Sequence, residues 1–215
     1  MRKILVAVLV LFGTSLSASP DAGAIRVVNL GTRTITAFNL VGFGFRDVGL
    51  DRRPGDVLTP AFASDVTKYE LFWRLDDGSV HGETVELAEH LPPDAYSAPV
   101  VIGIHDDTLS VTWAERDPRW SRPNLDGKWE PVTGPGFTRC EGPLLTHPLA
   151  TAAWGVRARE MTSKNPSINP AEHHCSLDWY IPYSNRQREQ VDEQTEALLR
   201  AEWHAEIEAF KTKRE

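Results

Sequence analysis

The chain has 215 residues, of which 41% are hydrophobic, and its formal net charge at pH 7 is −7. This length and composition fit one domain with an appendage, or two small domains, and supply enough apolar residues for a globular core. The acidic charge repels phosphate backbones, so we expect no nucleic-acid partner.

The first 18 residues have the order of a secretory signal peptide. Arg2 and Lys3 make the start basic, residues 4–12 are continuously apolar, and small or polar residues follow. The apolar run has nine residues. A membrane-spanning helix needs roughly 20, so we expect no stable membrane anchor. We therefore predict cleavage near Ala18, with Ala24 as the alternative point, and localisation in the periplasm or outside the cell.

Residues 19–115 have the pattern of short strands joined by tight turns. The clearest hairpin covers residues 68–87, where apolar and polar side chains alternate on either side of a turn at residues 76–78. A second hairpin covers residues 99–113 and turns at residues 105–108. At least six such strands, with one polar face, predict a mainly β fold, either an antiparallel β-sandwich or an open barrel.

Residues 116–183 form a segment rich in proline and tryptophan, which we predict to be an irregular extension lying over the sheet. The prolines between residues 118 and 148 forbid regular strands there. Beyond them the pattern favours one more strand at residues 151–161, a polar loop at residues 163–172 and a short strand at residues 177–183.

The two cysteines of the chain, Cys140 and Cys175, both lie in this extension. In an exported protein an even pair predicts a disulfide, which stabilises the fold by about 4 kcal/mol in the chain-entropy model. The alternative is a metal site formed by the cluster Glu172, His173, His174 and Cys175, which Cys140 could join. Adjacent histidines point to different sides of a strand, and no second ligand spacing supports them. We therefore predict the disulfide, with no metal and no other cofactor.

Residues 184–215 predict a C-terminal amphipathic helix. Ser184 and Gln187 have the spacing of a capping box. Apolar side chains then recur along one stripe, which includes Leu199, Trp203, Ile207 and Phe210. A helix of about 28 residues is roughly 40 Å long, which exceeds the width of a domain of this size. The stripe therefore either packs on the chain's own sheet or binds a partner.

No sequence motif for catalysis stands out. The chain has no G-x-S-x-G, no H-E-x-x-H and no glycine-rich phosphate loop. The aspartates of the two hairpin turns are of the kind that usually satisfies backbone groups. Glu115 and Asp117, which follow Trp113, are either a carboxylate pair for glycoside cleavage or solvated charges after a strand. We favour a protein without catalytic activity.

Several tryptophans surround the proline-rich segment, among them Trp120 and Trp129, with Trp154 and Trp179 further along the chain. Aromatic faces can stack on sugar rings. Large rings also fill the gaps of a segment that lacks a regular core, and we favour this packing role.

The strand pattern of residues 25–113 resembles small exported bacterial β-sandwich proteins of uncharacterised function. The resemblance is carried by the opening strand at residues 25–29, the Arg53-Pro54-Gly55 turn, and the strands at residues 69–75 and 109–113. Some proteins of this kind resemble periplasmic immunity partners that neutralise secreted antibacterial toxins. The resemblance assigns no site residue.

These observations predict an exported, non-catalytic protein-binding module, for example an immunity or inhibitor protein acting in the periplasm. Its partner would be another protein, such as a secreted toxin, bound by the helix stripe together with Trp120 and Trp129. An acidic surface suits a basic partner through electrostatic steering. The alternative is an envelope enzyme acting on carbohydrate, or a carbohydrate-binding module.

Overall fold

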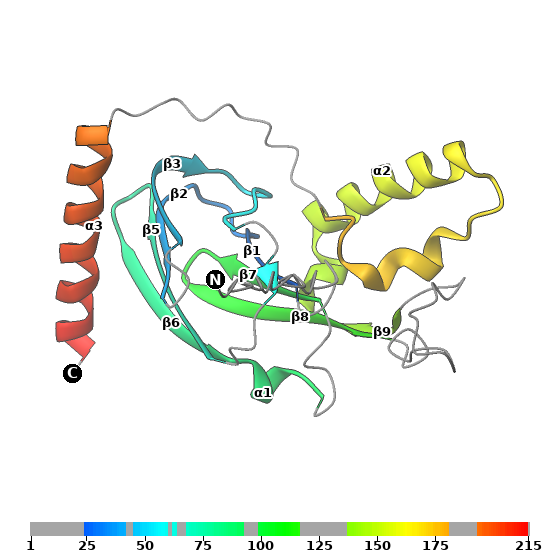
Figure 1. Cartoon of the computed structure of the whole chain (residues 1–215), viewed down its shortest axis with the longest axis horizontal. Helices are drawn as coiled ribbons and strands as arrows, with labels where there is room; N and C mark the ends of the chain where they lie inside the picture. The colour runs from blue at the N-terminus through cyan, green and yellow to red at the C-terminus, as the bar shows by residue number, and fades with distance from the viewer. Residues whose placement is uncertain are drawn as a thin grey trace, which may run out of the picture.

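The computed structural model describes residues 24–41, 45–59, 62–63, 68–92, 99–116, 137–180 and 193–214 (Figure 1). Several predictions fall outside these ranges: the signal peptide at residues 1–18, Asp117, Trp120 and Trp129, and the start of the C-terminal helix at residue 184. Among the described residues, no helix is long and apolar enough to cross a membrane.

The strands form two sheets. Sheet A has the order β4 (Phe62–Ala63), β1 (Ala24–Asn29), β7 (Val100–His105), β8 (Thr108–Arg116) and β9 (Phe137–Glu141). Sheet B has the order β3 (Phe45–Arg52), β2 (Ile35–Leu40), β5 (Lys68–Leu75) and β6 (Val80–Glu86). The two predicted hairpins are confirmed, because β5 pairs with β6 and β7 pairs with β8 in antiparallel register.

The facing sides of the two sheets share one buried hydrophobic cluster. Ile25 and Val27 of β1 contribute to it from sheet A, and Phe38 of β2 and Leu71 of β5 contribute from sheet B. Val28, the next residue of β1, belongs instead to a second cluster on the outer side of sheet A. Successive side chains of a strand point to opposite faces, so β1 is apolar on both sides because both faces of sheet A are covered.

Helices cover the outer faces of both sheets (Figure 1). On sheet A lie the 3-10 helix η2 (Pro143–Thr146), the helix α2 (Pro148–Lys164) and the 3-10 helix η3 (Pro170–Ser176). On sheet B lies α3 (Glu193–Arg214), while the short α1 (Leu87–His90) follows β6. Helix and strand are present in comparable amounts. The prediction of a mainly β fold is therefore only partly confirmed.

Sheet A is mixed, because β1 and β7 run parallel. The prediction of purely antiparallel pairing is therefore wrong for this pair. The reason is topological. Between β1 and β7 the chain forms the short strand β4 and all of sheet B, and a long crossover of this kind can bring a strand back in the same direction.

Residues 151–161, predicted as a strand, are part of the helix α2. Pro148 occupies the first turn of α2, where its missing N–H costs nothing. His147 caps the helix by accepting a hydrogen bond from the backbone N–H of Leu149 at 3.3 Å. Alanine, arginine, glutamate and methionine, all good helix formers, fill the turns that follow. Local helix propensity therefore prevailed over a short stretch of alternation.

The described part of the predicted irregular extension is mostly regular. β9 extends sheet A by pairing with β8, and residues 170–172 of the expected loop belong to η3. The expected strand at residues 177–183 is wrong for residues 177–180, which have no strand conformation. Leu177 instead takes a left-handed conformation with φ 55°. The predicted disulfide between Cys140 and Cys175 is present, with Cα atoms 5.2 Å apart.

Candidate functional site

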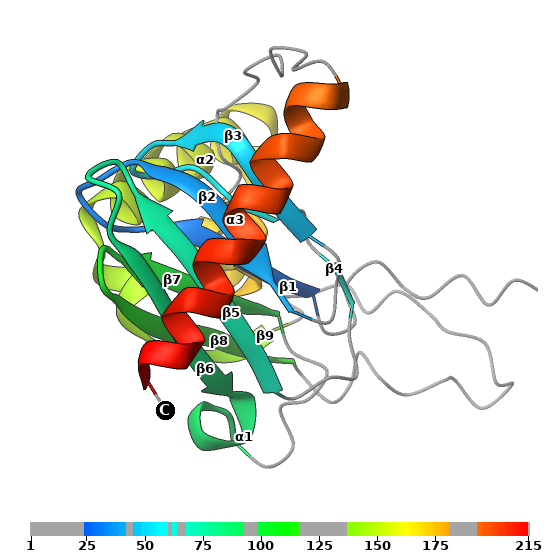
Figure 2. The same ribbon diagram turned by 90° about the vertical axis from the view of Figure 1, so that its left-hand side faces the viewer.

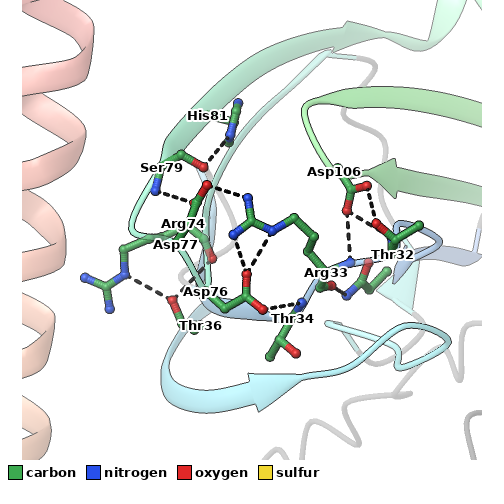
Figure 3. A network of polar contacts seen from close by, with 11 residues as sticks. Thr32, Arg33, Thr34, Thr36, Arg74, Asp76, Asp77, Ser79, His81 and Asp106 are labelled. Atoms are coloured by element: carbon green, nitrogen blue, oxygen red, sulfur yellow. Dashed lines mark hydrogen bonds and ion pairs between the residues drawn. The ribbon is translucent and has the colours of Figure 1, made fainter.

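Three connections from both sheets meet at one end of the molecule (Figure 3). They are the β1–β2 loop, the β5–β6 turn and the β7–β8 turn. The Arg33 guanidinium of the first loop pairs with Asp76 of the β5–β6 turn at 2.7 Å, and also with Asp77. We call this surface the acidic loop end and define it by Arg33, Asp76, Asp77, Asp106 and Asp107.

Asp106 ties the β7–β8 turn to the β1–β2 loop. Its carboxylate accepts hydrogen bonds from the backbone N–H of Thr32 at 3.0 Å, from the Thr32 hydroxyl at 2.9 Å and from the backbone N–H of Arg33 at 3.0 Å. Its backbone carbonyl accepts a further bond from the indole N–H of Trp73 at 2.6 Å. The two loops are therefore held together by one residue that is anchored in both sheets.

The local sequence suits this junction. Asp106 has φ 55°, and aspartate is one of the few residues besides glycine that adopt this left-handed region readily. A Cβ atom at Gly31 would lie 2.6 Å from the backbone nitrogen of Asp106. Only glycine therefore allows the β1–β2 loop to approach the β7–β8 turn this closely.

The ion pair between Arg33 and Asp77 at the acidic loop end favours the charged forms of both side chains. The hydrogen bond from Arg33 holds the pKa of Asp77 well below its usual range, with further lowering by Ser79. The same bond raises the pKa of Arg33. Four carboxylates outnumber one guanidinium, so the surface carries net negative charge at neutral pH. Asp107 is exposed and makes no side-chain hydrogen bond or ion pair within the described part of the chain.

Next to this surface lies a small histidine cluster that the sequence did not indicate. The Nε2 atom of His105 is 2.7 Å from the Ser110 hydroxyl, and its ring lies 5.8 Å from that of His147. Burial and the neighbouring His147 lower the pKa of His105, against a smaller raising effect of Asp106. His105 and Ser110 lie near each other because Ser110 pairs with Gly103 across the hairpin. This register could have been inferred from the predicted turn.

This cluster has part of the chemistry of a nucleophilic site. A neutral imidazole bonded to a serine hydroxyl can accept its proton, but an efficient base is usually oriented by a third group. Among the described residues no carboxylate hydrogen-bonds the other nitrogen of His105. The Nδ1 atom of His147 is engaged in capping α2, so its other ring nitrogen carries the proton in the neutral state.

The predicted metal candidates lie in an aromatic cluster beside the disulfide. His174 stacks on Trp179 with ring centroids 5.5 Å apart and packs against Trp154 at 4.8 Å. The indole N–H of Trp179 donates to the His174 carbonyl at 2.6 Å. Burial lowers the pKa of His174. His174 is thus a packing partner here. His173 is half-buried, and both cysteines are consumed by the disulfide, which removes the thiolates that the metal alternative required.

The helix stripe that was expected to bind a partner lies on the chain's own sheet. Trp203 and Ile207 are 1% and 3% exposed, and they form a cluster with Ala37 and Phe72 of sheet B. Leu199 and Phe210 pack against the same cluster. In this arrangement the stripe does not face solvent, so a partner could reach it only if α3 left the sheet.

Five of the seven tryptophans are described, and their exposure bears on the carbohydrate alternative. Trp73, Trp113, Trp179 and Trp203 are buried, and Trp154 is half-buried. The rings of Trp154 and Trp179 are inclined at 60° to each other. These five tryptophans therefore do not form a flat exposed row on which a sugar chain could stack.

Comparison with known proteins identifies no family. No protein-family model matches the chain, and no curated protein matches it. Among solved structures, the chain is similar to the NMR structure of a protein from Eubacterium rectale. That match has 13% identity and a TM-score of 0.29, and it covers 42% of this chain and 86% of the other. A likeness this weak carries no argument about function.

Proposed function

We propose that this chain is an exported, non-catalytic protein-binding module whose acidic loop end binds a basic surface of another protein. The single observation that carries the proposal is the way Arg33 and Asp106 tie three connections into one charged surface. Binding residues are often found on loops that a rigid scaffold positions. A surface with little freedom to lose on binding is favourable for association.

Export is supported by two independent features. The basic, apolar and small-residue order of residues 1–18 is typical of a secretory signal. The disulfide between Cys140 and Cys175 is typical of proteins that mature in an oxidising compartment. The periplasm is therefore the proposed location, and an immunity or inhibitor role against a basic toxin is the proposed context.

Charge supports the choice of partner. The chain as a whole is acidic, with a formal net charge of −7, and the acidic loop end has four aspartates and one arginine. Complementary charge accelerates association and disfavours partners of the wrong sign. At 0.1 M salt the screening length is about 10 Å, so the proposed complex should weaken as salt is raised.

Photo-crosslinking from a single exposed position tests the proposal. A photoreactive amino acid replaces Asp107, and in a matched control it replaces Ala152, an exposed residue of α2. The proposal expects a discrete crosslinked protein with a basic surface from position 107 and not from position 152. The product should disappear when Asp76 and Asp77 are changed to Asn or when salt is raised. The same products from both positions, or none from position 107, would refute it.

A further inference from the structure

The helix α3 packs on sheet B through a hydrophobic cluster that is separate from the core between the two sheets. Trp203 and Ile207 pack with Ala37 and Phe72 in a cluster of their own, and they take no part in the core between the two sheets. Figure 2 shows α3 lying across the outer face of sheet B. The core between the two sheets contains no residue of α3, so detachment of this helix would break the cluster on the outer face of sheet B and not that core.

Charged contacts specify where α3 lies. Arg74 of β5 pairs with Glu206 at 2.8 Å, and its guanidinium lies 5.8 Å from the Trp203 ring centroid. At the C-terminal end of α3, the Arg214 guanidinium donates to the Gly82 carbonyl of the edge strand β6 at 2.6 Å. Arg74 of the sheet therefore pairs with Glu206 of the helix. The two charges of this pair can be exchanged by substitution.

The interface between α3 and sheet B also contains two buried polar atoms without a hydrogen-bond partner among the described residues. The indole nitrogen of Trp203 and one carboxylate oxygen of Glu206 are buried, and neither has a hydrogen-bond partner among the described residues. Burying an unpaired donor and an unpaired acceptor is unfavourable. The contact between α3 and its own sheet is therefore weaker than its apolar packing alone would make it.

A detached α3 would leave Phe72 and Ala37 uncovered on sheet B, and the surface that fits them by construction is another α3. Twelve residues, 181–192, connect Tyr180 to α3. A segment of that length can span up to about 40 Å, which sets how far a detached α3 can reach toward a second copy. We propose that sheet B also binds the α3 of a second copy of this chain, each copy giving its helix to the other in a swapped dimer.

Charge exchange between two full-length variants tests this proposal. Arg74→Glu places a carboxylate against Glu206, and Glu206→Arg places a guanidinium against Arg74, so each variant repels its own helix. When the two variants are mixed, both opposite-charge pairs reform only if the helices exchange. Light scattering after size exclusion and native mass spectrometry should show at least about tenfold more heterodimer in the mixture than homodimer in either variant alone.

The double variant, with Arg74→Glu and Glu206→Arg in one chain, is the matched control. It restores the pair within one molecule and should behave as the wild type does. A mixture that stays monomeric, or variants that dimerise equally well alone, would overturn the proposal. If the single variants fail to fold, isotope-filtered NOEs between labelled and unlabelled wild-type copies decide the question at high concentration. Contacts between Phe72 of one copy and Ile207 of another support exchange, and purely intramolecular contacts refute it.

Discussion

Replacing Asp106 by alanine should destabilise the protein more than any other single change at the acidic loop end. Its carboxylate accepts bonds from Thr32 and from the backbone of Arg33, and it holds φ 55° without a glycine. Asp106→Ala removes every carboxylate bond at once and leaves a residue that does not favour this backbone conformation. Asp106→Asn keeps the shape and the conformational tolerance but loses the charge.

The magnitude follows from the exposure of each bond. The two bonds from Thr32 are exposed, so water replaces them at little cost. The bond from the Arg33 N–H is partly buried, and losing a charged acceptor there costs about 1.5 kcal/mol. An alanine in the left-handed region adds about 1–2 kcal/mol. We expect Asp106→Ala to lower the free energy of unfolding by about 3 kcal/mol and Asp106→Asn by about 1 kcal/mol.

Urea denaturation followed by tryptophan fluorescence measures this difference. With an m-value of about 2 kcal/mol/M, a loss of about 3 kcal/mol lowers the midpoint by roughly 1.5 M. Asp107→Ala is the matched control, because Asp107 is the exposed neighbour in the same turn, and its midpoint should not move. A midpoint for Asp106→Ala within about 0.2 M of the wild type would refute the reasoning that this carboxylate holds the loops together.

Three further predictions concern the rest of the fold. Changing both Cys140 and Cys175 to alanine opens a loop with a sequence separation of 35, and should cost about 4 kcal/mol in urea denaturation; equal midpoints would contradict this. Arg26, whose pKa is lowered by burial against a raising effect of Asp178, donates to the carbonyls of Leu177 and Tyr180 at 3.1 and 3.3 Å. Arg26→Met should therefore cost about 2 kcal/mol and reduce the near-UV circular dichroism of the aromatic cluster, whereas unchanged spectra would argue against this role. Burial and His147 lower the pKa of His105 below its usual value of 6.5, so the unfolded chain binds a proton at this residue more readily than the folded protein does. The stability contributed by neutral His105 is therefore present above pH 6.5 and is lost as the pH falls below it. His105→Gln should make the free energy of unfolding less dependent on pH between 5 and 7.5, and an identical pH profile would contradict this assignment.

The wild type supplies the reference for the pH experiment, and His174 supplies a second check. Burial also lowers the pKa of His174, so His105→Gln should flatten the profile only in part. The residual slope should fall further in a variant that also carries His174→Gln. The change in slope caused by His105→Gln measures the contribution of His105, and the further change caused by His174→Gln measures that of His174.

The acidic loop end shows why candidate sites were hard to find from the chain alone. Asp76, Asp77 and Asp106 were recognised as turn residues that satisfy backbone groups, and Asp106 does so. Arg33 was not singled out, because its partners are more than 40 residues away in the sequence. Only the stacking of the two sheets brings their turns to one end of the molecule.

The sequence by itself determined the elements whose signals are local. Alternating side chains predicted the hairpins β5–β6 and β7–β8, the stripe along residues 199–210 predicted the helix α3, and a lone pair of cysteines predicted the disulfide. Each of these depends on a repeat of two or of 3.6 residues, or on a pair with no alternative partner. Those signals do not depend on the rest of the fold.

Tertiary structure decided what those elements face. The parallel pairing of β1 with β7 joins two strands that β4 and all of sheet B separate in the chain. The helix α2 arose where its cap and its helix formers outweighed a brief alternation. For Trp203 and Ile207, the apolar outer face of sheet B determines that this part of the α3 stripe is buried within its own chain. Burial depends on distant segments, because an apolar face becomes core only when another element covers it.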